Sequence, residues 1–240
     1  MKILDDLIST LHFNSPVRDI RQGVFHTAVL SRNCGLAATL PRDALRQKPP
    51  LVKEAGALTE KSAEQLAQMA YCESLLEAAI GVAAINSLLE VDETSCVERN
   101  AADLIIERGE GKNIAIVGHF PFIPRVRQRA AGLWVIEKNP VDEDLPEPEA
   151  DNVIPQADVV GITGTALTNH TLDHLLALSK PDAYVIILGD SAPLSPIFFD
   201  HGVDAVAGTK VIDPELALRC VSEGANFRQI KGTKRLIMAK

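Results

Sequence analysis

Residues 159–170 read VVGITGTALTNH, a short apolar run that stops at a small, polar, glycine-marked turn. Two other stretches have the same form: residues 113–122 read NIAIVGHFPF and residues 184–194 read YVIILGDSAPL. Short β-branched runs bounded by glycine are typical of buried strands in a parallel sheet. Ligands of open α/β sheets bind in the crevice outside the carboxyl ends of such strands. The three strand ends therefore predict where a site lies, but not its reaction.

The composition is that of an ordinary globular protein. The chain has 240 residues, 46% hydrophobic and 23% charged, which is enough for one large domain or two modest ones. A net charge of −8 without a block of Lys or Arg argues against nucleic-acid and membrane-surface partners. The four cysteines form no CxxC pair, so we expect reduced thiols in a cytoplasmic protein. Asp5 and Asp6 interrupt the apolar positions of residues 3–11, which fit a helix face and not a signal peptide.

The first hundred residues read as strands followed by helices. Two strands, residues 19–31 and 34–40, are predicted to form a hairpin around residues 32–33. Two helices are predicted next, over residues 62–71 and 74–89, and the second is so rich in small residues that another backbone can approach it closely. Prolines mark the loop between hairpin and helices: Pro41, Pro49 and Pro50.

From residue 100 strands alternate with helices, which predicts βαβ units and a parallel sheet. The acidic, proline-rich segment 140–157 is expected to be a solvated loop. We therefore expect a small α+β domain over residues 1–98 and a doubly wound α/β domain over residues 99–240. Predicted strands cover 113–117, 133–137, 158–163, 183–188, 203–206 and 234–238, and predicted helices cover 101–108, 123–130, 169–179 and 214–223.

The first strand of this second domain ends in Gly118 and His119 and not in a GxGxxG fingerprint. Pro121 and Phe122 would obstruct the approach of a pyrophosphate, which argues against ordinary dinucleotide binding. A histidine at a strand end can be a metal ligand, a general base or a structural residue, and the sequence leaves the three alternatives open.

The second strand end carries Thr163 and Thr165, and a helix is predicted to begin at Asn169. Backbone N–H groups and hydroxyls at such a turn can cradle an anion or polar ligand. The alternative is that Thr168 or Asn169 only caps the helix. Both roles are compatible, because a cap uses one side chain and leaves the loop N–H groups free.

The third strand end, Gly189-Asp190-Ser191, is similar to the nucleophile motif of Gly-Asp-Ser esterases, although it stands on a later strand than in those enzymes. Ser191 is thus a candidate nucleophile, or else it hydrogen-bonds the following turn. Glu137 ends another strand, and carboxylates with imidazoles can bind a transition metal.

As an ordered set, these motifs resemble the "putative heavy-metal chelation" domain family, a domain of unknown function. The resemblance covers roughly residues 100–240, and residues 35–37 and 81–86 resemble the domain that commonly precedes it. It implies a Rossmann-like domain preceded by an enolase N-terminal-like domain, with a site between them. Family members often have a Gly-Pro-Ser turn where this chain has Asp190, which adds a carboxylate. The motifs are Val117 to Phe122, Leu145-Pro146-Glu147, Ala157-Asp158, Thr163 to Thr165, Asn169 to Asp173, Leu188 to Leu194, Gly202-Val203-Asp204 and Ala207-Gly208.

We expect a polar interdomain cleft at the strand ends that binds a transition metal ion or a metal-bearing small molecule. The expected metal ligands are His119 and Glu137 or Asp190, which suit Zn, Fe, Ni or Co. An enzyme acting on a small anionic metabolite by group transfer or hydrolysis, with His119 as general base, is the alternative. A homodimer is expected from base rates alone. The other residues expected in the cleft are Gly118, Thr163, Thr165, Asn169 and Ser191, with Asn86 or Asn33 from the first domain.

Overall fold

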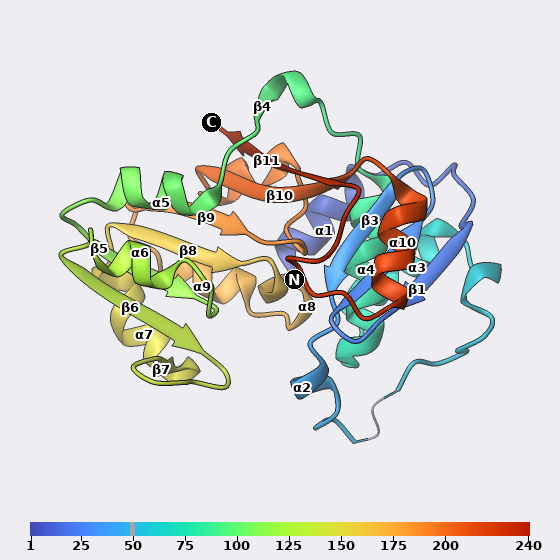
Figure 1. The fold of residues 1–240 in the computed structure, drawn as a ribbon, viewed down its shortest axis with the longest axis horizontal. Helices are drawn as coiled ribbons and strands as arrows, with labels where there is room; N and C mark the ends of the chain where they lie inside the picture. The colour runs from blue at the N-terminus through green and yellow to red at the C-terminus, as the bar shows by residue number, and fades with distance from the viewer. Residues whose placement is uncertain (49–50) are drawn as a thin grey trace.

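In the computed structural model, residues 1–48 and 51–240 form two sheets (Figure 1). The small sheet has three antiparallel strands, β1 (Asp19–Gln22), β2 (His26–Leu30) and β3 (Cys34–Ala38). The large sheet has the order β4-β11-β10-β9-β8-β5-β6-β7 and is parallel from β10 to β7. Its strands are β4 (Cys96–Val97), β5 (Asn113–Val117), β6 (Gly132–Glu137), β7 (Leu145–Pro146), β8 (Val159–Thr163), β9 (Tyr184–Leu188), β10 (Ala205–Val211) and β11 (Thr233–Ala239). The α/β fold with a mostly parallel sheet is therefore confirmed.

Both faces of the large sheet are buried, as the apolar runs of its strands predict. Ile114 of β5 packs in a core beside α5 (Ala101–Gly109) and α6 (Ile123–Arg127). The next residue, Ala115, joins the core on the other face, with α9 (Leu172–Leu178). Alternate side chains thus enter two different cores, which is the pattern of a doubly wound sheet.

Helix α4 (Leu75–Leu88) covers one face of the small sheet at very short range. A Cβ atom at Gly35 would lie 2.2 Å from the carbonyl oxygen of Ala83 and 2.3 Å from the amide nitrogen of Ser87. The close backbone approach expected of this small-residue helix is confirmed.

The opposite face of the small sheet is covered by α10 (Pro214–Ser222), which comes from near the other end of the chain (Figure 1). Leu218 and Val221 of α10 pack against Leu36 of β3. In return, α1 (Lys2–Ser9) packs on α9 beside the large sheet, and the backbone N–H of Ile3 donates to Asp173 there. Each sheet is completed by a helix from the far part of the chain, an arrangement we call the helix exchange.

Several predicted elements are shorter or divided. The long strand over 19–31 is broken by a tight turn, where the N–H of Gly23 donates to the carbonyl of His26 at 2.8 Å. The helix predicted over 62–71 has Ser62 as its N-cap, in a capping box with Gln65. It consists of α3 (Ala63–Gln68) followed by the 3₁₀ turn η2 (Met69–Tyr71). The helix over 169–179 is shortened to α9, which begins at Leu172, and a separate helix α8 (Thr165–Thr168) precedes it. The left-handed backbone at His170, with a φ of 63°, separates the two helices.

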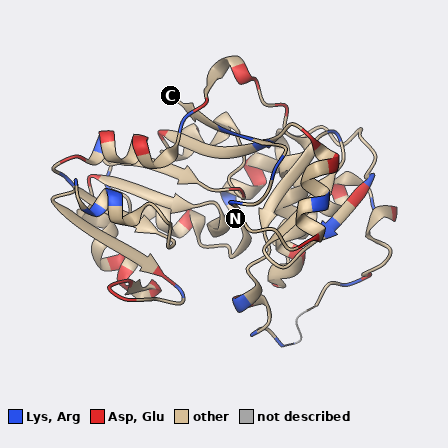
Figure 2. Cartoon of the chain, viewed as in Figure 1, with Lys and Arg blue, Asp and Glu red and all other residues tan. Residues whose placement is uncertain are grey.

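Two predicted loops contain structure. Pro41 begins the short helix α2 (Pro41–Ala44), since proline suits the first turn of a helix, whereas Pro49 and Pro50 lie outside the described residues. The acidic segment contains β7 and α7 (Ala150–Val153), with 3₁₀ turns η4 (Glu147–Glu149) and η5 (Ile154–Gln156) on either side of α7. Figure 2 shows acidic residues of this segment, coloured red, around β7. No helix in the described part of the chain is long and apolar enough to cross a membrane.

Substituting alanine at Gly35 tests the close packing of β3 on α4. The added Cβ would collide with backbone atoms of α4, so G35A is expected to lower the free energy of unfolding by about 2 kcal/mol or more. Gly161 is the matched control, because it also lies in a buried strand and a Cβ there would meet only side-chain atoms at 3.6 Å or farther. Urea unfolding of the two variants measures the difference, and equal stability would contradict the packing.

Candidate functional site

Two cavities lie at the carboxyl ends of the parallel strands. The larger cavity has a volume of about 600 Å³ and the smaller cavity about 180 Å³. Both are also lined from the small sheet or the loop after it: Phe25, His26 and Ala38 line the larger one, and Leu40 and Asp43 the smaller one. The two cavities share four lining residues, His119, Phe120, Thr163 and Thr165.

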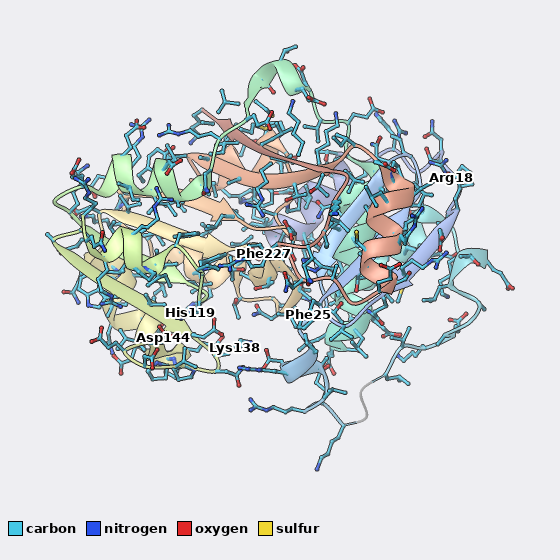
Figure 3. The ribbon with its side chains drawn as sticks, in the orientation of Figure 1. Arg18, Phe25, His119, Lys138, Asp144 and Phe227 are labelled. Carbon is cyan, nitrogen blue, oxygen red and sulfur yellow. The ribbon has the colours of Figure 1, made fainter. Side chains whose placement is uncertain are left out.

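His119 is held in a defined orientation where the two cavities meet. Its ring Nδ1 lies 2.8 Å from Oδ2 of Asp144, whose side chain is only 3% exposed, whereas the His119 side chain is 42% exposed. The buried carboxylate favours the tautomer with the proton on Nδ1, which leaves Nε2 with its lone pair. Among the described residues Nε2 has no hydrogen-bond partner. Figure 3 shows His119 and Asp144 at this edge of the sheet.

Glu137 closes the turn that presents His119. Its Oε2 accepts the backbone N–H of His119 at 2.9 Å, and its Oε1 accepts the N–H of Lys138 at 2.9 Å. Gly118 has a φ of +103°, which allows the chain to turn sharply after β5. Glu137 lines the smaller cavity, but both of its oxygens already hold the ends of β5 and β6 in place.

Asp190 is engaged elsewhere, at the floor of the larger cavity. Its Oδ2 lies 2.9 Å from Nε2 of His26, and its Oδ1 accepts the hydroxyl of Thr209 at 2.6 Å. Burial alone would raise the pKa of the Asp190 carboxyl, but the hydrogen bonds from His26 and Thr209 and the charge of Arg235 outweigh burial and lower it. Asp190 therefore joins the two sheets as an ion.

The three expected metal ligands, His119, Glu137 and Asp190, do not form one cluster. In residues 1–48 and 51–240, no group of three or more His, Cys, Asp or Glu side chains is arranged to hold a metal ion. His119 is the member of the set that keeps a free ligand atom. A site with three or more such protein ligands is therefore not found among the described residues.

Ser191 does not have the environment of a nucleophile. Its hydroxyl oxygen accepts the backbone N–H of Ala38 at 2.8 Å, and the residue is 2% exposed. Two histidines that follow an aspartate in the sequence are paired with other acids and not with Ser191: His174 with Asp151 and His201 with Asp6. The hydrogen-bond partner of Ser191 lies in β3 and not in the following turn as predicted, so the serine fixes the turn after β9 against the end of β3.

The second strand end forms a compact polar turn. The hydroxyl oxygens of Thr163 and Thr165 lie 3.0 Å apart, and both residues line both cavities. Asn169 lines the smaller cavity, and its Oδ1 accepts the hydroxyl of Thr171 at 2.7 Å. Thr171 is the N-cap of α9 and no side chain caps that helix, so the prediction that Asn169 caps it is wrong. The Thr163 and Thr165 side chains lie beside the cavities.

Asn33 and Asn86 line neither of these cavities. The side-chain amide of Asn33 donates to the carbonyl of Leu89 at 2.9 Å, and that of Asn86 donates to Leu36 at 2.8 Å. Both line a separate space of about 30 Å³. They tie α4 to the small sheet, because each satisfies a carbonyl at the edge of that contact.

Several residues of the site were not predicted. Asp144 is one of six acids in a segment interpreted as solvated, and only its burial distinguishes it. Phe25 stands in a turn that was interpreted as continuous strand, and His26 is the first residue of β2 after that turn. Phe227 lies in the loop before β11, where the sequence has no periodic apolar pattern. A signal was available only for Phe25, because the Gly-Val-Phe sequence of residues 23–25 breaks the strand alternation.

Comparison with known proteins identifies the family. A family model described as "Putative heavy-metal chelation" matches residues 100–240, and a second with the same description matches residues 4–89. The chain belongs to the DUF364 family. It is 30% identical over 182 residues to an uncharacterized protein of Methanocaldococcus jannaschii, covering 73% of this chain and 70% of the relative.

Two solved structures of DUF364 proteins share the fold. The protein of unknown function from Desulfitobacterium hafniense has a TM-score of 0.89 at 24% identity, over 100% of this chain and 98% of its own. The one from Pyrococcus horikoshii, also of unknown function, has a TM-score of 0.85 at 22% identity, over 99% of this chain and 100% of its own. The resemblance found in the sequence motifs is therefore confirmed, and these structures support the α/β fold.

Replacing Asp190 by asparagine tests its role between the sheets. At pH 7, D190N is expected to lower the free energy of unfolding by about 1–3 kcal/mol, because His26 and Thr209 lose a charged acceptor. The folded-state pKa of Asp190 lies below the unfolded value of about 3.9, so its contribution is present above about pH 4 and is lost as the pH falls through the folded pKa.

Urea unfolding at several pH values measures this contribution. The gap between wild type and D190N should be full at neutral pH and should narrow in acid. Asp142→Asn is the control, since Asp142 is exposed and should change stability by less than about 0.5 kcal/mol. A D190N variant as stable as wild type at pH 7 would show that the pair contributes nothing.

Ser191 gives a separate test. S191A leaves the N–H of Ala38 without its acceptor, so it is expected to lower the free energy of unfolding by about 1–3 kcal/mol. A fluorophosphonate probe should label neither wild type nor S191A, as judged by intact-protein mass spectrometry. Labelling of wild type that disappears in S191A would restore the nucleophile hypothesis.

Proposed function

We propose that this protein binds a metal-bearing small molecule in the two cavities, with His119 as the protein's ligand to the metal. The observation that carries the proposal is the His119 ring itself. Its Nδ1 is fixed by the buried carboxylate of Asp144, and its Nε2 is free on a side chain that lines both cavities. Histidines that ligate metals commonly have their second nitrogen held in this way.

The ligand set favours a metal that arrives already chelated. One imidazole supplies a single coordinate bond to a metal. Among the described residues, no group of three or more metal-ligating side chains is present to supply the others. A small molecule that contributes the remaining ligands would complete the coordination. Imidazole suits Zn, Fe, Ni or Co, and the family description points in the same direction.

An enzyme is the second candidate, and the same histidine favours it. A neutral imidazole whose Nδ1–H is held by a carboxylate can act as a general base through Nε2. Thr163 and Thr165 lie beside the same cavities and could hydrogen-bond a small anionic metabolite. Group transfer or hydrolysis of such a metabolite would consume it, so product analysis distinguishes this candidate from binding alone.

The assembly and its setting belong to the same proposal. We expect a homodimer, a first domain like the enolase N-terminal domain, no nucleic-acid partner and a cytoplasmic location. Sedimentation equilibrium at several protein concentrations measures the oligomeric state, and a monomer at all of them would refute the dimer.

Thermal unfolding with a chelated metal tests the role of His119. Ni(II)-nitrilotriacetate is a suitable probe, because its chelator leaves two coordination positions for protein atoms. At about a hundred times its Kd, the complex should stabilise the chelator-treated protein by about 2.7 kcal/mol and raise the Tm by about 5–10 °C. The rise should disappear in H119A, and D144N should weaken binding by about 10–100-fold.

His174→Ala is the matched control. His174 also pairs with a carboxylate at 2.8 Å, that of Asp151, but it lines neither cavity. H174A should therefore respond to Ni(II)-nitrilotriacetate as wild type does. An equal rise in H119A and wild type would remove His119 from the metal site.

A further inference from the structure

The larger cavity is lined by four arginines and, among the described residues, by a single carboxylate. Of the arginines that line it, Arg125 pairs with Asp103 at 2.7 Å and Arg99 pairs with Glu107 at 2.5 Å. Arg228 and Arg235 also line the cavity, and neither forms an ion pair with any carboxylate in the described chain. Such arginines are available to an anionic ligand.

The charge of the single acid acts on Arg235, but this acid forms no direct ion pair with either arginine. Asp190 is the one carboxylate among the described lining residues. Its oxygens are taken by His26 and Thr209 at 2.9 and 2.6 Å. In a chain with a net charge of −8, a cavity with two unpaired guanidinium groups is a local reversal of sign, and such a reversal selects anions.

Aromatic rings stand next to these arginines. The guanidinium carbons of Arg228 and Arg235 lie 5.5 and 5.8 Å from the centre of the Phe227 ring. Phe25 lines the same cavity from the turn between β1 and β2 of the small sheet. Phe25 is 45% exposed and Phe227 is 39% exposed. Figure 3 shows both rings where the two sheets meet. Exposed aromatic side chains gathered at one cavity mark a binding site for an apolar surface.

A stacked pair of rings adds to the apolar lining. Phe120 and Phe122 follow β5 with their ring centres 5.1 Å apart and their planes inclined by 13°. Both line the larger cavity, and Phe120 lies next to His119 in the chain. The volume of about 600 Å³ is in the range of sites for ligands the size of a cofactor.

We infer that the larger cavity takes a small molecule in which a planar aromatic part is joined to an anionic group, a phosphate or a carboxylate. The aromatic part packs on Phe25 and Phe227, and the anion pairs with Arg228 and Arg235. Guanidinium groups bind both kinds of anion in a bidentate manner. The inferred class is that of the small molecule in the proposed function. The inference rests on the proposed function only for the metal, because the aromatic and anionic contacts need no metal.

Isothermal titration calorimetry of the metal-free protein tests the inference with three probes. 1-Naphthyl phosphate carries both parts, 1-naphthol carries the ring alone, and inorganic phosphate carries the anion alone. We expect 1-naphthyl phosphate to bind at least tenfold more tightly than either of the others. Absence of binding, or equal binding of 1-naphthol or inorganic phosphate, would overturn the inference.

Substitutions assign the two contacts. R228Q and R235Q should each weaken 1-naphthyl phosphate at least tenfold, and F227L should weaken it while leaving inorganic phosphate unchanged. Arg129→Gln is the matched control, because Arg129 is an exposed arginine that does not line the cavity. All four side chains are exposed, so thermal unfolding should show the variants folded. Wild-type affinity in R228Q and R235Q would overturn the arginine assignment.

The outcome is separable from that of the metal experiment. If H119A abolishes the response to Ni(II)-nitrilotriacetate but wild type does not bind 1-naphthyl phosphate, the class of molecule inferred here is wrong and the metal proposal stands. If 1-naphthyl phosphate binds through Arg228 and Arg235 while H119A responds to the nickel complex as wild type does, the metal proposal fails and this inference stands.

Discussion

The turn after β9 is the contact on which the arrangement of the two sheets depends. Two consecutive residues of this turn form hydrogen bonds to the small sheet. The carboxylate of Asp190 bonds the imidazole of His26, and the hydroxyl oxygen of Ser191 accepts the N–H of Ala38. The turn after β8 packs directly beneath, since a Cβ atom at Gly164 would lie 2.4 Å from the amide nitrogen of Ala192. Buried polar groups with their partners in place favour one relative position of the sheets.

This position creates two cavities of different charge on either side of His119. The smaller cavity is lined by the carboxylates of Asp43, Glu137 and Glu147 and by Lys138, whose ammonium group pairs with Glu147 at 3.6 Å. The larger cavity has the unpaired Arg228 and Arg235. A molecule that combines a cation with an anionic body would experience a field that orients it before any specific contact forms. The charges of the two cavities and the free nitrogen between them are thus consistent with a chelated metal as the occupant.

The sequence was sufficient for the elements whose cause is local. The apolar runs ending at Gly118 and Gly189 predicted strands of a parallel sheet, and the strand ends that line the cavities followed from that. The side-chain pairs were not predictable, because His119 meets an acid 25 residues away and His26 meets one 164 residues away, with no spacing rule to connect them. The prediction that Asn33 lines the cavity was wrong for a similar reason. Tertiary packing decides which edge of the small sheet faces the strand ends, and it places Asn33 at the contact with Leu89.

The helix exchange has a consequence for how the chain is made. A ribosome adds about 5–20 residues per second, and α10 follows α4 by roughly 125 residues, so about 6–25 s pass before α10 is synthesised. During that time the small sheet has α4 on one face but lacks the helix that covers Ala28 and Leu36 on the other. An uncovered apolar strand face is a place where nascent chains associate with one another. Synthesis that stalls before α10 therefore leaves the apolar residues of this face without their covering helix and open to other chains.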